Sequence, residues 1–375
     1  MRVVMGDLLT GRRILDVPFV SADWSVELNA PGAVKCTVDL RDPDVQSLDM
    51  RNAATPGKSF LAAVVDGVVV EAGPIWARSY DRATGELTLN ARGLWSYFDH
   101  RTLLPDLGVQ PVVDPVTGES AAYANSAWSG LSLGTIGKRI VEQSMTWPGG
   151  DLPIVFEADK AGANERNYVG AELPVIGQML QNLTEVDDGP DIEFRPRWST
   201  DRLGVEWLYR SGDPRIASSS VMLLDTTVPS SPVKDLTVDD SAARMGSLGW
   251  CSGGRSADVS LVERSLDPLL LDAGFPLMER VDSSRSSVKE QATLLAYAVE
   301  LARTGRKSLA QWSVAVHTGG DGEPLVTDFS VGDFVDIKLG GDLFIPDDVY
   351  RRRIVNISGQ ADDPIIKLGL GETYG

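Results

Sequence analysis

The sequence predicts a β-rich α+β fold, with a small antiparallel β-barrel domain at each end of the chain and helix-containing domains between them. Segments in which apolar and polar residues alternate lie near both ends, separated by Gly, Asp and Pro turns. Apolar stripes of helical spacing lie between these segments. The 37 Gly and 21 Pro residues are scattered along the 375-residue chain, which is typical of a folded protein with frequent turns.

The first expected domain spans residues 1–100. Asp66 and Gly67 form a hairpin turn between two apolar segments, and the strand that follows them has its apolar residues on one side. An upstream hairpin is expected to extend this half-buried sheet or to close it into a small barrel. The expected strands are residues 23–28, 33–40, 60–65, 68–80 and 86–91.

Residues 101–215 are expected to form a loop-rich α+β insertion domain, and residues 216–285 a connecting region of strands and loops. An amphipathic helix is expected near Thr135–Met145, where two isoleucines lie one turn apart. A second helix is expected to begin around Glu172, with Pro174 in its first turn. It is expected to stop at residues 187–190 and to be followed by a hairpin of strands 192–198 and 203–210.

The last expected domain spans residues 286–375 and combines one helix with a second β-barrel. Ser287 and Glu290 have the spacing of a capping box, and Gly305 is expected to end the helix. The apolar face of this helix is expected to consist of Val288, Ala292, Leu295, Val299 and Ala302. The expected strands are residues 310–316, 331–339, 352–358 and 365–370.

The two β regions share a pattern. Residues 75–93 and 353–371 each contain a strand, an acidic turn, and an alternating strand that ends in Gly. The sequence leaves both an internal duplication and a chance similarity open as explanations.

The composition excludes several classes of function. A net charge of −18 and a pI near 4.6 would repel a phosphate backbone, so stable DNA or RNA binding is not expected. A carboxylate-lined pore, in contrast, lets DNA pass without sticking. Cys36 and Cys251 are the only cysteines and form neither a disulfide framework nor a metal motif. Because no signal peptide and no long apolar stretch occur, we expect no membrane span and synthesis in the cytoplasm.

A serine-hydrolase motif occurs by letter but in the wrong context. Gly130–Gly134 matches G-x-S-x-G, and His317 lies downstream as that triad order requires. The preceding residues are small and polar and do not form the buried strand that the motif needs, so Ser132 or Thr135 is expected to cap a helix. His100 and His317 are the only histidines, so we expect no histidine metal cluster, and both should be structural or at the surface.

Paired carboxylates do not by themselves indicate catalysis. A glycosidase needs two carboxylates about 5 to 10 Å apart across a cleft, whereas each Asp pair here falls at an expected turn. Residues 185–193 lack the spacing of a calcium loop, and residues 369–371 precede no helix that would bind phosphate. We therefore expect no catalytic, cofactor-binding or metal site. The pairs are Asp187–Asp188, Asp239–Asp240, Asp347–Asp348 and Asp362–Asp363.

Nine tryptophans are spread over the chain. Most fall on expected strands or beside expected helices, where large aromatic side chains anchor cores or subunit interfaces. Trp128 and Trp147 lie in the loop-rich region instead, so they are the candidate residues for contacting a ligand or a partner chain.

Two patterned segments lie near the two ends of the chain. The first is VVEAGPIW at residues 69–76 with DRATGELTLNARGLW at residues 81–95, and the second is VGDFV at residues 331–335 with RRIV at residues 352–355 and the closing strand. They resemble minor tail proteins of siphophages, especially phages of actinobacteria, and in particular the hub or tail-associated protein of the tail tip.

This resemblance implies a homotrimer below a hexameric ring of distal tail protein. The C-terminal end of the tape-measure protein would plug the channel, and receptor-binding or fibre proteins would attach outside. Some members of the family carry an added C-terminal hydrolase or fibre domain. The sequence stops at Gly375 just after its last expected strand, so no lytic activity is expected.

We therefore interpret the chain as a non-enzymatic structural protein of the virion, located at the tail tip. The alternative is a peripheral carbohydrate-binding or receptor-binding tail module, which exposed Trp128 and Trp147 would favour. A third reading, a cell-wall hydrolase, would need His317 or a carboxylate pair to converge with Ser132 or with each other in a cleft.

Overall fold

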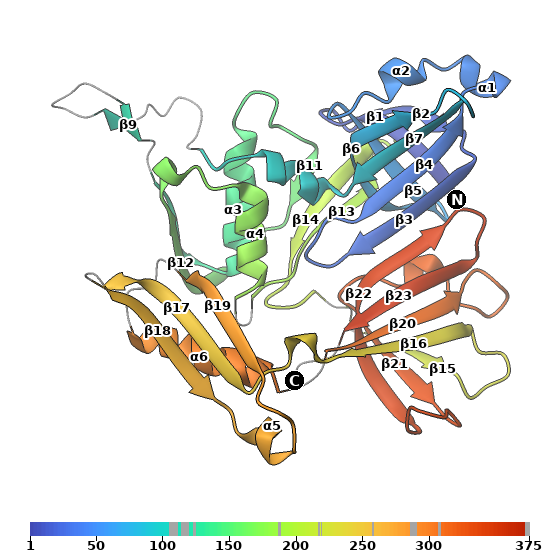
Figure 1. Cartoon of the computed structure of the whole chain (residues 1–375). Helices are drawn as coiled ribbons and strands as arrows, with labels where there is room; N and C mark the ends of the chain where they lie inside the picture. Colours follow the sequence, from blue (N-terminus) through green and yellow to red (C-terminus); the bar gives the residue numbers. More distant parts are fainter. Residues whose placement is uncertain are drawn as a thin grey trace. The chain divides into compact units, whose positions relative to one another are not determined.

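The computed structural model contains two compact units (Figure 1). Unit 1 comprises residues 1–236 and 314–375, and unit 2 comprises residues 237–313. The structure describes residues 1–104, 112–113, 120–122, 125–186, 189–216, 218, 220–256, 259–285, 291–306 and 309–371.

Strands from both ends of the chain join in one 13-stranded sheet. Its order is β16-β20-β23-β22-β3-β4-β7-β6-β5-β1-β2, and β21 pairs with both β15 and β22. The N-terminal strands are β1 (Arg2–Asp7), β2 (Arg13–Val17), β3 (Ser21–Glu27), β4 (Ala33–Asp39), β5 (Ser59–Val65), β6 (Val68–Tyr80) and β7 (Glu86–Arg92). The C-terminal strands are β15 (Met222–Asp225), β16 (Val233–Ser241), β20 (Leu309–His317), β21 (Phe334–Leu339), β22 (Asp348–Gln360) and β23 (Ile365–Gly371).

The β-rich α+β class agrees with the sequence prediction, but the two closed barrels do not form. Strand β3 of the N-terminal region pairs antiparallel with β22 of the C-terminal region, from Glu27 opposite Asn356 to Asp23 opposite Gln360. The sheet therefore continues from one region into the other. Alternation along a strand identifies its buried face, whereas pairing between distant strands depends on tertiary packing that a single sequence does not specify.

The two segments with a shared sequence pattern form similar hairpins. Strands β6 and β22 each have 13 residues, and their partners β7 and β23 each have seven. The pairing register shifts between Ile75 and Ala77 in the first hairpin and between Ile354 and Asn356 in the second. Both hairpins thus have a β-bulge directly after an isoleucine, which bends the long strand at the same place.

Helices α3 (Leu133–Met145) and α4 (Ile176–Thr184) lie between the two β regions in the sequence. The first helix is confirmed, and its Ile136 and Ile140 are fully buried. The predicted start of the second helix at Glu172 is wrong. Leu173 has a left-handed backbone with φ of 47°, and Val175 is extended, so the helix begins only at Ile176.

The remaining elements of unit 1 are short. The predicted hairpin of residues 192–198 and 203–210 is confirmed as β13 (Ile192–Trp198) and β14 (Val205–Ser211), and β11 (Ile154–Phe156) adds to it in parallel. The others are α1 (Pro43–Gln46), α2 (Met50–Ala53), η1 (Leu94–His100), β8 (Val112–Val113), β9 (Ser120–Ala122), β10 (Ser126–Leu131), β12 (Ala161–Tyr168), η2 (Gly170–Glu172) and η4 (Val326–Asp328).

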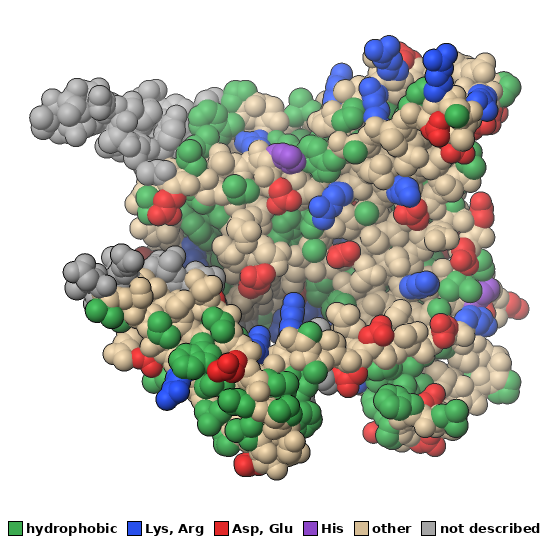
Figure 2. All heavy atoms as spheres, in the orientation of Figure 1, with side chains coloured by type: hydrophobic (Ala, Val, Ile, Leu, Met, Phe, Trp, Pro, Cys, Tyr) green, Lys and Arg blue, Asp and Glu red, His purple; other side chains and the backbone are tan. Residues whose placement is uncertain are grey.

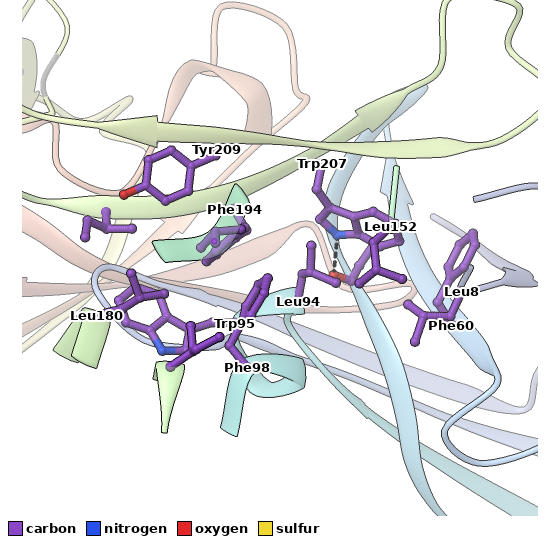
Figure 3. Close-up of a cluster of buried hydrophobic side chains, with 14 of the residues drawn as sticks. Leu8, Phe60, Leu94, Trp95, Phe98, Leu152, Leu180, Phe194, Trp207 and Tyr209 are labelled. Carbon is purple, nitrogen blue, oxygen red and sulfur yellow. Dashed lines mark hydrogen bonds between the residues drawn. The ribbon is translucent and has the colours of Figure 1, made fainter. Parts of the chain in front are cut away.

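The main core of unit 1 is formed by aromatic and aliphatic side chains from the N-terminal sheet, η1, α3, α4 and the β13–β14 hairpin (Figure 3). Phe194 stacks on Phe98 with ring centroids 5.0 Å apart and meets Tyr209 edge to face at 5.4 Å. The indole N–H of Trp207 donates a 2.9 Å hydrogen bond to the carbonyl oxygen of Ala72. This bond satisfies a buried donor and fixes β14 against β6.

A buried ion pair joins three distant segments of unit 1. Asp191 is fully buried and pairs with Arg353, which is 9% exposed. The Asp191 carboxylate also accepts from the backbone N–H of Ile216 at 2.7 Å and from the side-chain amide of Asn29 at 3.3 Å. Arg353 donates further bonds of 3.0 Å to the carbonyl oxygens of Gly332 and Ile216. The pair is therefore well satisfied, as a buried pair must be to be tolerated.

Unit 2 is a small sheet with one helix packed on it. Strand β17 (Leu248–Ser256) lies between β18 (Val259–Leu266), which is antiparallel to it, and β19 (Glu279–Arg285), which is parallel. Helix α6 (Gln291–Thr304) packs on this sheet through a core of Cys251, Leu294 and Ala298. The unit also contains η3 (Ala242–Arg244) and α5 (Leu269–Asp272).

The expected buried face of this helix is wrong except at Ala302, and Val288 lies outside the described residues. Leu294, Ala298 and Ala302 are buried, whereas Leu295 and Val299 are 43% and 47% exposed. The apolar residues of this helix cover two adjacent faces, and their spacing alone does not show which of the two faces packs on the sheet. The end of the helix at Thr304, directly before Gly305, agrees with the prediction, and the capping box at Ser287 and Glu290 lies outside the described residues.

Candidate functional site

A deep pocket in unit 1 is the candidate functional site. Its volume is about 830 Å³, including the solvent at its open side. Segments from both β regions and from β13 line it, so it exists only because β3 and β22 pair. The lining residues are Trp24, Val26, Glu27, Ala30, Pro31, Gly32, Val68, Val69, Val70, Glu71, Gly93, Leu94, Trp95, Glu193, Phe194, Arg195, Pro196, Val326, Thr327, Phe329, Ser330, Val331 and Ile357.

Glu71 is the most deeply buried ionisable residue of this lining, with 4% of its surface exposed, and the Glu193 side chain is 11% exposed. Its Oε1 atom accepts a 2.9 Å hydrogen bond from the backbone N–H of Ala72. Its Oε2 atom receives no hydrogen bond from the part of the chain that the structure describes. Two glycines leave room for the carboxyl: a Cβ on Gly32 would lie 2.1 Å from Oε2, and a Cβ on Gly93 would lie 3.2 Å from Oε1.

Burial raises the pKa of Glu71 from 4.5 to about 8. The negative charges of Glu193 and Glu27 add to this rise, and the hydrogen bond from Ala72 opposes it. Glu71 is therefore a neutral acid at pH 7. Burial also raises the pKa of Glu193, whereas the charge of Arg210 lowers it, through a 2.6 Å contact with the Glu193 carboxylate.

The pocket combines apolar walls with two largely buried acids, Glu71 and Glu193, of which Glu193 pairs with Arg210. Trp95, Phe194 and Phe329 contribute buried aromatic side chains, and Glu27 and Arg195 are exposed. The lining contains no histidine or cysteine. Such an arrangement can hold one polar or charged group of a ligand against Glu71 while its apolar part contacts the walls.

Ser132 and the histidines behave as the sequence predicts. Ser132 is the N-cap of α3, and its side chain accepts from the backbone N–H of Thr135 at 3.2 Å. His317 instead contacts Glu323, and His100 lies at the surface against the Trp76 ring. Nothing in this arrangement activates Ser132 as a nucleophile.

The structure tests the predicted turn position for three of the four Asp pairs, and for one of them the prediction is wrong. Asp239–Asp240 lies on β16 and not at a turn, because it belongs to an edge strand of the sheet whose side chains are exposed. Asp362–Asp363 lies between β22 and β23, Asp347–Asp348 lies at the start of β22, and Asp187–Asp188 lies outside the described residues. Within the described ranges, no three His, Cys, Asp or Glu side chains are grouped so that they could hold a metal ion.

Trp128 and Trp147 are both half-buried. Trp128 lies on β10, packs against the main core, and meets Tyr168 edge to face with ring centroids 6.2 Å apart. Trp147 follows the C-terminal end of α3. Neither residue lines the pocket at Glu71.

The sequence contained a signal for Glu71 that pattern reasoning missed. Glu71 is a lone acid in the strand VVVEAGPIW, between apolar residues and two residues before Gly73. An acid at a core-facing position of a strand is unusual, because burying a charge is costly unless the group is paired or neutral.

The fold of the chain is similar to that of two solved phage tail proteins. It is similar to the 43 kDa tail protein of prophage MuSo2 from Shewanella oneidensis, with a TM-score of 0.57, 11% sequence identity, and coverage of 99% of this chain and 98% of that one. It is also similar to the tail protein from Neisseria meningitidis MC58, with a TM-score of 0.56, 15% identity, and coverage of 99% and 97%.

Sequence comparison adds nothing to this structural likeness. No family model matches the sequence, and no curated protein matches it either. In the part of the chain that the structure describes, no helix is long and apolar enough to cross a membrane.

Proposed function

We propose that this chain is a non-enzymatic structural protein of a phage virion, a hub-type minor tail protein at the tip of a non-contractile tail. The observation that carries the proposal is the fold, which matches two phage tail proteins over nearly the whole of each chain. Its proposed partners are the distal tail ring, the C-terminus of the tape-measure protein, and receptor-binding or fibre proteins. DNA would pass through an acidic channel without specific binding.

The proposed assembly is a homotrimer. Each chain contributes two similar hairpins, β6–β7 and β22–β23, with equal strand lengths and a bulge at the same place. Three chains would therefore present six similar β modules, which suits contact with a sixfold tube. An internal duplication would account for this likeness.

An exposed apolar loop supports a role in assembly. Leu343 and Phe344, between β21 and β22, are 105% and 84% exposed. Asp342 accepts hydrogen bonds of 2.8 Å from the backbone N–H groups of Phe344 and Ile345, which holds the loop in one conformation. Apolar side chains gather at this tip on the face drawn in Figure 2. A preordered apolar tip is suited to dock on a neighbouring copy of the chain.

The test is the mass of the purified protein by light scattering, followed by electron microscopy of any oligomer. A threefold ring with a central hole is expected. A chain that stays monomeric at high concentration, and also in the presence of its distal tail ring, would contradict the hub role. Trp128 and Trp147 stay proposed contacts for a ligand or partner, and loss of cell binding on their replacement would favour the alternative, a peripheral carbohydrate-binding or receptor-binding module.

A further inference from the structure

We propose that the pocket at Glu71 binds one organic cation on a short apolar stem, an alkylguanidinium or alkylammonium group such as ends an arginine or lysine side chain. This inference does not depend on the proposed tail function. It names a binding site inside unit 1 and the chemical class of its ligand.

The first argument is the unpaired carboxyl oxygen. Glu71 is 4% exposed, its Oε1 is occupied by the N–H of Ala72, and no described residue donates to its Oε2. Oε2 is not among the fully buried side-chain atoms that lack a partner, so this oxygen is open to solvent and can accept from a donor outside the chain. Gly32 and Gly93 have no Cβ, which leaves the space that the Glu71 carboxyl itself occupies. The room for a donor from outside is the pocket that Glu71 lines.

The second argument is the character of the walls. Trp95, Phe194 and Phe329 are buried aromatic residues of the lining, and Val69 and Ile357 add aliphatic surface. Methylene groups pack well on such walls, and aromatic rings attract cations. A hydrated metal ion would gain little there, and the described residues hold no group of ligands for one.

The third argument is the sign of the local charge. Glu27 on β3 and Glu193 on β13 both act on Glu71 with negative charge. The positive groups near them are Arg195 at the open side of the pocket and Arg210 on β14, and both act on Glu193. Glu27 and Glu193 are thus balanced by the two arginines while Glu71 is neutral, and ionisation of Glu71 adds a negative charge that favours a cation over an anion.

Binding of a cation must be linked to loss of the Glu71 proton, because only the ionised carboxylate forms the ion pair. With a pKa of about 8, roughly one tenth of the free pocket is ionised at pH 7 and roughly nine tenths at pH 9. The apparent affinity should therefore rise about tenfold between pH 7 and pH 9, and binding at pH 7 should release about 0.9 protons.

The experiment is titration calorimetry with n-butylguanidinium, whose charge does not change in this pH range. Measurements in two buffers of different ionisation enthalpy count the protons released. The neutral isostere n-butylurea is the matched ligand. Glu71→Gln is the test variant, and Glu165→Gln, at an exposed position of β12, is the control. Circular dichroism of each variant establishes that it is folded.

We expect a dissociation constant in the millimolar range at pH 9, proton release at pH 7, no binding of n-butylurea, and loss of binding in Glu71→Gln alone. Three outcomes would each overturn the proposal. These are no binding of n-butylguanidinium at pH 9, binding without proton release at pH 7, and equal binding by the folded Glu71→Gln variant.

Discussion

Replacement of Glu71 by Gln removes the titration of the buried acid while keeping its size and shape. The folded chain holds the Glu71 proton more tightly than the unfolded chain, because burial raises the pKa from 4.5 to about 8. The resulting stability is fully present below about pH 4.5 and is lost as the pH rises through about 8.

The size of the effect follows from the two pKa values. Each pKa unit corresponds to about 1.4 kcal/mol, so the rise from 4.5 to about 8 amounts to about 5 kcal/mol at most. About 4 kcal/mol of this falls between pH 5 and pH 9. Glu27, Glu193, Arg195 and Arg210 also surround the site, but they are present in both proteins and largely cancel from the comparison.

The assay is urea unfolding of the wild-type protein and the Glu71→Gln variant at half-unit steps from pH 5 to pH 9, followed by tryptophan fluorescence. Between pH 5 and pH 9, the free energy of unfolding of the variant should rise by about 4 kcal/mol relative to that of the wild type. Parallel stability curves for the two proteins would refute the reasoning, because they would mean that Glu71 titrates as a solvated carboxyl. A wild-type protein that loses stability only below pH 5 would refute it as well.

Three further variants test other parts of the structure. Arg353→Ala should lower the free energy of unfolding by about 3 to 5 kcal/mol in urea melts, because it leaves the fully buried Asp191 without its main partner. Phe344→Asp should leave the urea midpoint unchanged but weaken self-association about tenfold or more in light scattering, since Phe344 is 84% exposed. Gly249→Ala should destabilise unit 2 by about 1 to 3 kcal/mol in hydrogen exchange, because its Cβ would lie 2.5 Å from the carbonyl oxygen of Ala298.

Each of these variants has a matched control. Arg351→Ala breaks an exposed pair with Asp336 and should cost far less than Arg353→Ala. Val20→Asp changes another exposed apolar residue and should not alter self-association. Ser252→Ala removes only a hydroxyl group elsewhere on β17 and should leave hydrogen exchange of α6 unchanged. Equal effects in a variant and its control would contradict the corresponding explanation.

The sequence was most informative where structure is local. The Asp66-Gly67 turn, the alternating strands and the Ser132 cap all depend on neighbours within a few residues, and the structure confirms them. The start of α4 was missed because the left-handed backbone at Leu173 is set by its surroundings and not by its residue type. The boundaries of the four expected domains stay predictions.

Long-range features could not be predicted from one sequence. The pairing of β3 with β22 and the Asp191–Arg353 ion pair join residues far apart in the chain. Nothing in the local pattern around Arg353 distinguishes it from Arg351 and Arg352, which it follows. Only its position on β22 points it into the protein, where it is 9% exposed.

The ion pair and the pocket are coupled through one tight turn. Asn29 adopts a left-handed backbone with φ of 59°, which Asn tolerates better than most residues. Its side chain donates to Asp191 at 3.3 Å and accepts from the backbone N–H of Ile192 at 2.8 Å, so the turn between β3 and β4 is held against the start of β13. Three residues later, the same turn places Gly32 against the carboxyl of Glu71. The buried pair therefore stabilises more than the junction between the two β regions, because it also fixes the backbone that shapes the pocket around Glu71.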